Sequence, residues 1–171
     1  EIVIAGTVTH LSQTVTEPDP ITGEWVPQHR ILLQGSNFTL TPTGTLNADY
    51  KGYKPGAGPG RPPGTKHAGG GYGGTGGDAF GGGRHGQSYG EPDDPWQPGS
   101  GGAISTSVDG SAGGAILIQL GGQATIDGTI SACGGNGGTT HASAASGGGI
   151  ALYCRTFQGA ASGLIRANGG R

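Results

Sequence analysis

Glycine is the feature that most constrains what this chain can fold into. Of its 171 residues, 41 are glycine, and these cluster in GG and GGG runs instead of recurring at every third position, which excludes a collagen helix. Glycine and the 11 prolines together make up about 30% of the chain, a level at which low-complexity disorder is the usual expectation. Any folded core must therefore be thin, because glycine contributes no side chain to bury.

Charge and hydropathy exclude several classes of partner. Charged residues are 12% of the chain and the formal net charge is −2, so there is no basic field to bind nucleic acid. The longest apolar run, residues 115–120, is far shorter than the roughly 18 residues that a membrane-spanning helix requires. We expect neither a nucleic-acid partner nor a membrane span. The chain begins at Glu1 without an apolar leader, so it reads as a mature or excised segment.

The C-terminal part of the chain contains an internal repeat. Residues 114–120 and 128–135 align with residues 149–155 and 163–170 at an offset of 35. A weaker copy lies upstream at an offset of 84 and begins at Arg30 and Gly44. Apolar positions align as well as glycines, since Leu46 matches Ile130 and Ile165. The repeat unit is therefore a pair of short strands that ends in a turn.

Apolar residues within these units alternate or form short β-branched runs, as in Ile116 and Ile118. This is the period of a β-strand, and glycine and proline interrupt every window that could form a helix. We predict an all-β fold, a parallel β-helix-like or sandwich stack of short strands with a long Gly/Pro-rich, polyproline-II-like insertion and almost no helix. We expect one composite domain with three parts. Residues 1–50 contain the N-terminal strands and the first repeat unit, and residues 51–113 are the Gly/Pro-rich segment packed on the strands. Residues 114–171 contain two repeat units of period 35.

Residues 51–113 have two interpretations. Their composition is typical of a flexible linker. Alternatively, glycine-rich segments can pack side by side in polyproline-II conformation, because no Cβ keeps their backbones apart. Five aromatic residues are spaced through this segment and could anchor it to the strands, which a linker would not need: Tyr53, Tyr72, Phe80, Tyr89 and Trp96.

The repeat resembles a family of glycine-rich extracellular β-helical repeat proteins, the surface adhesins and fibre subunits of bacteria and protists. The resemblance is carried by residues 113–118 with 128–135, and again by residues 148–150 with 165–170. It implies a structural role and an extracellular or cell-surface location. This chain departs from the pattern at Cys133, where the motif has Asn, and its first forty residues carry no family signature.

The sequence predicts two covalent modifications, a disulfide and an N-linked glycan. Cys133 and Cys154 are the only cysteines, and an even count in a chain of this class favours a disulfide; two separate buried thiols are the alternative. Residues 37–39 form the one N-glycosylation sequon, at Asn37. If Phe38 points inward, alternation points Asn37 outward, although a sequon of three residues also arises by chance.

Catalytic and metal-binding signals are weak throughout. Residues 73–81 match a calcium-binding nonapeptide with Phe80 in the apolar position, but such sites need several stacked copies and only one is present. The histidines lack ligand spacing, and the Gly-x-Ser-x-Gly sequence around Ser88 lacks the flanking strand and helix that give it meaning. We predict no metal, no cofactor and no enzymatic activity.

The function predicted from these features is that of a structural subunit of a surface fibre, adhesin or matrix, assembled through β-strand contacts. The N-terminal strand, with Ile2, Val3, Ile4 and Val8, is rich in β-branched residues and is the predicted connector to a neighbouring copy in a homopolymer. Two alternatives remain open. One is a carbohydrate- or ice-binding surface domain with a threonine-bearing face (Thr125, Thr129, Thr139 and Thr140), which would make glycans a partner; the other is a non-catalytic fragment of a polysaccharide-acting enzyme.

Overall fold

The computed structural model describes residues 1–64, 67–78, 84–104, 110–137 and 143–171. These residues form short β-strands and no helix, which confirms the all-β prediction, and they contain no helix that could span a membrane. The eleven strands are β1 (Ile2–Ile4), β2 (Thr7–Thr9), β3 (Ile31–Gly35), β4 (Phe38–Leu40), β5 (Thr45–Asn47), β6 (Ala115–Leu120), β7 (Gln123–Ile126), β8 (Thr129–Ser131), β9 (Gly149–Tyr153), β10 (Thr156–Gln158) and β11 (Leu164–Arg166).

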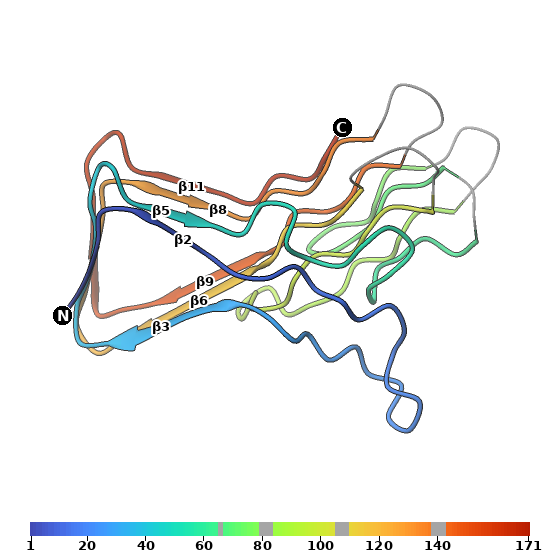
Figure 1. Cartoon of the computed structure of the whole chain (residues 1–171), viewed down its shortest axis with the longest axis horizontal. Helices are drawn as coiled ribbons and strands as arrows, with labels where there is room; N and C mark the ends of the chain where they lie inside the picture. Colours follow the sequence, from blue (N-terminus) through green and yellow to red (C-terminus); the bar gives the residue numbers. More distant parts are fainter. Residues whose placement is uncertain (65–66, 79–83, 105–109, 138–142) are drawn as a thin grey trace.

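The strands form three parallel sheets, ordered β1-β4-β7-β10, β11-β8-β5-β2 and β3-β6-β9. Consecutive strands along the chain belong to different sheets, so the chain builds four layers: β1–β2, β3–β5, β6–β8 and β9–β11. Each layer pairs in parallel with the next. Figure 1 shows two of the sheets as separate rows of strands, with the glycine-rich segments gathered beyond one end of the strands.

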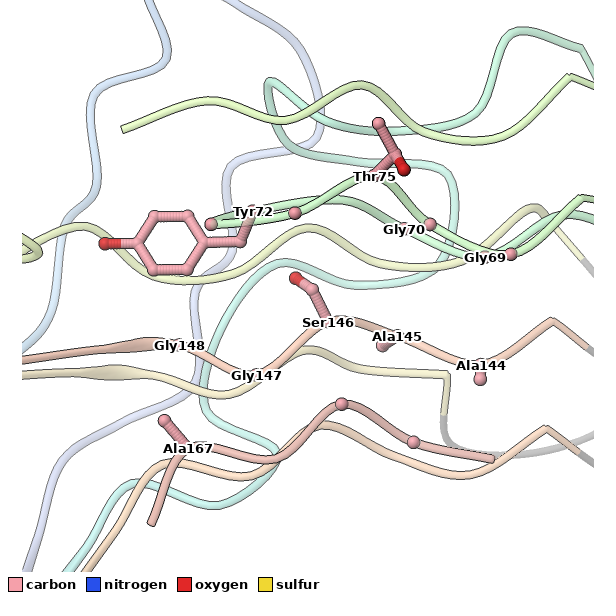
Figure 2. A pocket seen from close by; sticks show the side chains of 16 residues that line it. Gly69, Gly70, Tyr72, Thr75, Ala144, Ala145, Ser146, Gly147, Gly148 and Ala167 are labelled. Carbon is pink, nitrogen blue, oxygen red and sulfur yellow. The ribbon is translucent and has the colours of Figure 1, made fainter. Parts of the chain in front are cut away.

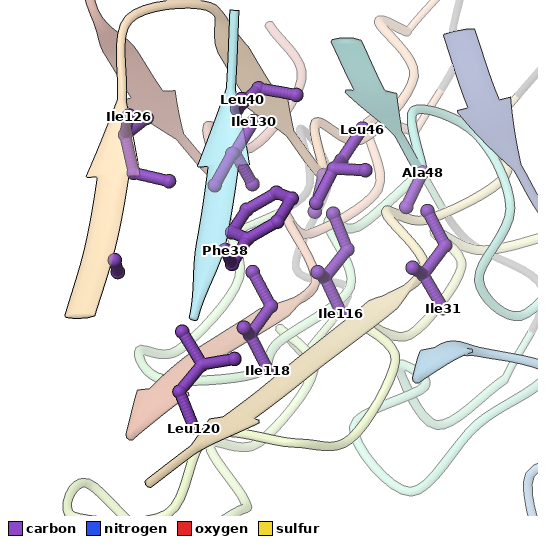
Figure 3. Packing of buried hydrophobic residues seen from close by; sticks show 12 residues of the cluster. Ile31, Phe38, Leu40, Leu46, Ala48, Ile116, Ile118, Leu120, Ile126 and Ile130 are labelled. Carbon is purple, nitrogen blue, oxygen red and sulfur yellow. The ribbon is translucent and has the colours of Figure 1, made fainter. Parts of the chain in front are cut away.

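The core is a set of columns that run through the layers. Alternation along each strand turns every second side chain inward, and parallel pairing places equivalent side chains one above another. Leu46 pairs with Ile130, and Ile31 pairs with Ile116. Figure 3 shows these side chains meeting in the space enclosed by the strands. The buried cluster consists of Ile31, Phe38, Leu40, Leu46, Ala48, Ile116, Ile118, Leu120, Ala124, Ile126, Ile130 and Ala132.

The repeat predicted from the sequence is present, but its register is not uniform. The column of Leu46, Ile130 and Ile165 is confirmed. In the third sheet, however, Ile116 pairs with Ile150 at an offset of 34, not with Ala151 as the uniform offset of 35 requires. A slip of one residue would turn Ile150 and Leu152 outward, so burial selects the shorter offset. The longer turn at residues 159–163 restores the offset to 35 in β11.

The N-terminal strands form a further layer that the sequence comparison did not detect. β1 pairs with β4, with Ile2 opposite Phe38, and β2 pairs with β5, with Val8 opposite Leu46. The offset changes from 36 to 38 residues between the two strands, which hides the repeat from a comparison that allows no gap. The inward side chains of this layer pack against the core cluster.

Glycine-rich segments from three parts of the chain are joined by backbone hydrogen bonds. The N–H groups of Gly71, Gly99 and Gly70 donate to the carbonyl oxygens of Gly60 (2.9 Å), Gly113 (2.9 Å) and Ala144 (3.1 Å). A Cβ atom placed on Gly148 would lie 1.8 Å from the carbonyl oxygen of Gly114. Backbone packs directly on backbone here, so no side chain fits between neighbouring segments.

Aromatic side chains fill the spaces that the glycines leave. Tyr53 is buried and meets the ring of Trp25 at a centroid distance of 5.2 Å, and Tyr72 meets Tyr89 at 5.0 Å, both edge to face. Burial raises the pKa of the Tyr53 hydroxyl and that of Tyr72 to about 12. Of the five aromatic residues expected to anchor this segment, Phe80 lies outside the described residues.

Candidate assembly surfaces and predicted sites

The last layer leaves one end of the strand stack uncovered. β10 and β11 each pair with a single strand, β7 and β8 respectively. Phe157 and Ile165 occupy the inward positions of this layer, in the columns of Ala124 and Ile130. They are 58% and 44% exposed, whereas Ala124 and Ile130 are fully buried. The inward face of this layer is therefore an apolar surface without a covering layer among the described residues.

The first layer leaves the opposite end uncovered. β1 and β2 each pair with one strand, and Ile2, Ile4 and Val8 are only partly buried. The N–H of Ile2 donates to Asn37 O (2.9 Å), and Ile4 O accepts from the N–H of Thr41 (3.0 Å). Because alternate residues of a parallel strand bond to opposite sides, the N–H and C=O of Val3 face the free edge. The predicted connector strand thus has one partner inside its own chain and one edge left over.

The two uncovered ends match each other in two of the three sheets. β1 and β10 lie at the two edges of one sheet, and β2 and β11 at the two edges of another. Their inward residues lie in the same columns, Ile2 with Phe157 and Val8 with Ile165. All pairings are parallel, so a second copy translated along the stack would present its first layer to the last layer of this one in the same strand direction.

The predicted disulfide is not present, and both cysteines are free. Cys133 follows β8 at the glycine-rich end of the strands, where its carbonyl oxygen accepts from Tyr50 N–H (3.0 Å). Cys154 follows β9 at the other end of the strands, next to the turn at Gly122, whose carbonyl oxygen accepts from Arg155 N–H (2.7 Å). β8 and β9 run in opposite directions in different sheets (Figure 1), so the two thiols cannot approach each other.

Asn37, the predicted glycosylation site, is exposed at the turn between β3 and β4. Phe38 next to it is buried, as the alternation predicted. The Oδ1 atom of Asn37 accepts from the N–H of Gln123 (2.8 Å). A glycan is attached through Nδ2 and would leave this hydrogen bond intact, so the geometry is compatible with modification.

A polar cluster at the end of β8 links three layers. Asp49 Oδ1 accepts from the N–H of Cys133 and from the hydroxyl of Ser131, both at 2.6 Å. Arg166 Nε donates to Ser131 Oγ (2.9 Å), and an Arg166 guanidinium nitrogen lies 3.9 Å from Asp49 Oδ2. These groups bond to one another across three layers, so the cluster acts as a clamp between layers. The sequence repeat could have predicted part of this cluster, because Ser131 and Arg166 are 35 residues apart and pair directly.

The threonine face expected for carbohydrate or ice binding is divided between sheets. Thr125 lies on β7 in the sheet that begins with β1, and Thr129 lies on β8 in the neighbouring sheet. Thr139 and Thr140 lie outside the described residues. Thr125 and Thr129 therefore do not share the single flat surface that the sequence suggested, although Thr129 lies in register with Thr45 and Thr7 on its own sheet.

No group of three or more metal-ligating side chains occurs in the part of the chain that the structure describes. In the calcium-like nonapeptide, Asp78 bonds to His85 Nδ1 at 2.5 Å, and the hydrogen bond and charge of His85 lower the pKa of the Asp78 carboxyl. Phe80 and Gly81 of that motif lie outside the described residues. Ser88, in the Gly-x-Ser-x-Gly sequence, is exposed in the glycine-rich region and does not join a strand to a helix.

A cavity of about 480 Å³ lies between glycine-rich segments. Figure 2 shows Gly69 and Gly70 on one wall and Ala144, Ser146 and Gly148 on another, with the ring of Tyr72 at one end. Its walls are mostly backbone, and Ser146 Oγ accepts from the N–H of Ser100 (2.9 Å) instead of facing a ligand. Its described lining residues include no Asp, Glu, His, Lys, Arg or Cys.

Comparisons with protein-family models, with curated proteins and with solved structures found no match.

Proposed function

We propose that this chain is an extracellular structural subunit of a surface fibre, adhesin or matrix, and that its copies assemble end to end through the open layers of the strand stack. In this proposal the stack is a parallel β-helix, and the glycine-rich segments form a polyproline-II-like bundle beyond one end of its strands. The observation that carries the proposal is the exposure of Phe157 and Ile165 at inward positions of the last layer.

Stacking a second copy would cover both exposed surfaces at once. The apolar side chains of the last layer would pack against Ile2, Ile4 and Val8 of the next copy, as those of each internal layer pack against its neighbour. The free edges of β1 and β10 would also pair, since an edge strand without lysine or proline is not protected against pairing. A contact of this head-to-tail kind propagates into open fibres because it does not close on itself.

The test is assembly state as a function of concentration, measured by sedimentation velocity and negative-stain imaging. The wild-type chain should form particles longer than one copy, and the fraction in them should rise with concentration. Phe157→Asp should abolish assembly without unfolding the monomer, because this side chain is already exposed. Ile21→Asp, at a position 93% exposed in a loop away from the stack ends, is the matched control and should assemble normally.

The N-terminal end needs its own variant. Deleting residues 1–11 would remove the layer that covers Leu40 and Leu46, so a loss of assembly after that deletion could reflect unfolding. Val3→Pro is sharper, because it removes only the N–H that faces the free edge and leaves the bonds to β4 in place. A wild-type chain that stays monomeric at every concentration, or a Phe157→Asp variant that polymerises normally, would overturn the proposal.

A further inference from the structure

A cleft on the side of the molecule brings together both tryptophans of the chain. One part is a cavity of about 590 Å³ whose walls include Trp25, Trp96 and Tyr89, with Glu24, Glu91 and Asp94 at its sides. A second cavity of about 340 Å³ shares Trp96 and Asp94 with the first and reaches Leu117, Gln119 and Tyr153 on the sheet β3-β6-β9. The two cavities are therefore neighbours with Trp96 and Asp94 in the walls of both, and we refer to them together as the cleft.

An arginine guanidinium lies over each indole ring. The guanidinium of Arg61 lies 5.3 Å from the centroid of the Trp25 ring, and that of Arg30 lies 4.6 Å from the Trp96 ring. Both tryptophans remain partly exposed. An aromatic ring fixed on one face and open to a cleft is a ready surface for stacking, because little conformational entropy is lost when a ligand binds.

Prolines and hydrogen bonds constrain the two loops that carry the tryptophans. Residues 91–98 contain three prolines, and the N–H groups of Asp94 and Trp96 donate to the carbonyl oxygens of Glu91 (3.1 Å) and Asp94 (2.9 Å). The loop that contains Trp25 is closed by the buried side chain of Gln13, whose Oε1 accepts from Gln28 N–H (2.7 Å). The cleft is therefore formed before any ligand arrives.

Polar groups line the cleft beside the rings. Asp94 Oδ1 accepts from the Tyr153 hydroxyl at 2.6 Å, and this bond raises the pKa of Tyr153 and keeps its hydroxyl protonated. On the adjacent sheet, Gln34 Nε2 donates to Gln119 Oε1 at 2.7 Å, which places both amides in the row that continues to Tyr153. Carboxylate and amide groups of this kind bind ligand hydroxyls.

We propose that this cleft is a binding site for a neutral oligosaccharide. A pyranose ring combines an apolar C–H face, which packs on an indole, with a rim of hydroxyls that donate to carboxylates and amides. The carboxylates of Glu24, Glu91 and Asp94 outnumber the two nearby guanidiniums, of which that of Arg61 is already paired with Glu17 (3.1 Å), so the net negative charge would repel an anionic sugar. A proline-rich peptide could stack on the same rings, but it lacks the N–H donors that these carboxylates need.

This site is separate from the assembly surfaces. The cleft opens on the side of the stack, whereas Phe157 and Ile165 lie at its end. The proposal therefore stands whether or not the chain polymerises, and a polymer would carry one cleft per copy, which raises avidity for a repetitive glycan.

The test is a titration of the native chain followed by intrinsic fluorescence. Trp25 and Trp96 are its only tryptophans, so their emission reports on the cleft alone. Cellohexaose, mannohexaose and chitohexaose are the neutral probes, oligogalacturonate is the anionic probe and an oligoproline peptide is the rival ligand. At least one neutral probe should change the emission with a dissociation constant of about 1 mM or tighter. The proposal would be overturned if the emission did not change with any of the three neutral probes, or if it changed only with oligoproline or oligogalacturonate.

Variants separate stacking from folding, with calorimetry as the common readout. Trp96→Ala should weaken binding by about tenfold or more, Trp96→Phe should keep most of it, and Ile21→Ala should leave it unchanged. If Trp96→Ala does not fold, Asp94→Asn tests the same site with both indoles present and should also weaken binding. Affinity that is unchanged in every one of the folded cleft variants would contradict the assignment.

Discussion

The strand stack and the glycine-rich region solve the same problem of burial in opposite ways. In the stack, neighbouring segments are joined by columns of Leu, Ile and Phe side chains, such as that of Leu46 and Ile130. In the glycine-rich region, neighbouring segments are joined by backbone hydrogen bonds with no side chain between them, as at Gly113 and Gly148. The strand stack is stabilised by the volume of its buried side chains. The glycine-rich region is stabilised by backbone contacts that require the absence of side chains.

This difference determines which substitutions each region tolerates. Removing side-chain volume from the stack leaves a cavity, whereas adding a single methyl group to the glycine-rich region pushes two backbones apart. The stack can relax around a smaller residue, but two backbones in hydrogen-bonding contact have no flexible group that can move aside. The largest losses of stability are therefore expected from glycine-to-alanine substitutions, which add only one methyl group.

Gly148→Ala should have the largest effect. The new Cβ would lie 1.8 Å from Gly114 O, and in Gly113→Ala it would lie 1.9 Å from Ala132 O. We expect each variant to lose about 3 kcal/mol or more of unfolding free energy, or to fail to fold. Gly73→Ala and Gly74→Ala are matched controls, because a Cβ at either position meets nothing within 4 Å. Chemical denaturation measures all four, and equal stability among them would remove the distinction between the regions.

Leu46→Ala should have the next largest effect. Leu46 is fully buried in the column that also contains Ile130 and Ile165, so its truncation should cost about 2–5 kcal/mol. Ile165→Ala, in the same column but in the uncovered last layer, should cost less than about 1 kcal/mol in the monomer. Denaturation at a concentration below assembly measures the difference. If Ile165→Ala proved as costly as Leu46→Ala, the end of the stack would have to be covered.

Ser100→Ala tests a buried polar network of the glycine-rich region. Ser100 is fully buried, its Oγ accepts from Gly60 N–H (2.8 Å), and it donates to the Tyr89 hydroxyl (3.0 Å). The variant leaves that N–H without a partner, which should cost about 1–3 kcal/mol. Ser88→Ala, at an exposed position, should change stability by less than about 0.5 kcal/mol. A Ser100→Ala variant as stable as the Ser88→Ala control would show that water replaces the lost hydroxyl.

The stack could be predicted from the sequence to the extent that side chains specify it. Alternation identified the strands, and the match of Leu46 with Ile130 and Ile165 identified a core column. The alignment of β9 was wrong by one residue because it was anchored on glycines, Gly114 on Gly149, while burial of Ile150 sets the register. The first layer was missed because its strands carry no glycine signature and its offset varies between strands.

The cleft could not have been predicted from local patterns. Trp25 and Trp96 lie in different loops, and each adjoins prolines that indicate a turn but not its direction. They meet because hydrogen bonds within each loop, such as Gln28 N–H to Gln13 Oε1 and Trp96 N–H to Asp94 O, fix the paths of the two loops. The disulfide prediction failed for a related reason: the spacing of two cysteines does not indicate at which end of its strand each one lies.

His10 lies where the two regions meet, and its titration should have the smallest effect. Its Nε2 atom is buried against Gly114 at the start of β6, without a hydrogen-bond partner among the described residues, while Nδ1 lies 2.7 Å from Leu11 O. Burial lowers the pKa of His10, and the positive charges of His29 and Lys51 lower it further, against the opposing hydrogen bond to Leu11. The folded chain therefore holds His10 neutral at a pH where the unfolded chain would protonate it.

The sign of the pH effect follows from this difference in proton binding. As pH falls through the ordinary histidine pKa of about 6.5, the unfolded state gains a proton that the folded state does not, so the unfolding free energy should decrease. Urea denaturation at about pH 7.5 and about pH 5.5 measures the loss in the wild-type chain and in His10→Gln. All other residues are the same in both proteins, so the difference isolates His10, and the variant should lose less stability than the wild type. Equal losses in both proteins would mean that protonated His10 is accommodated where the strand stack meets the glycine-rich region, and that the junction is less tightly closed than the contact with Gly114 indicates.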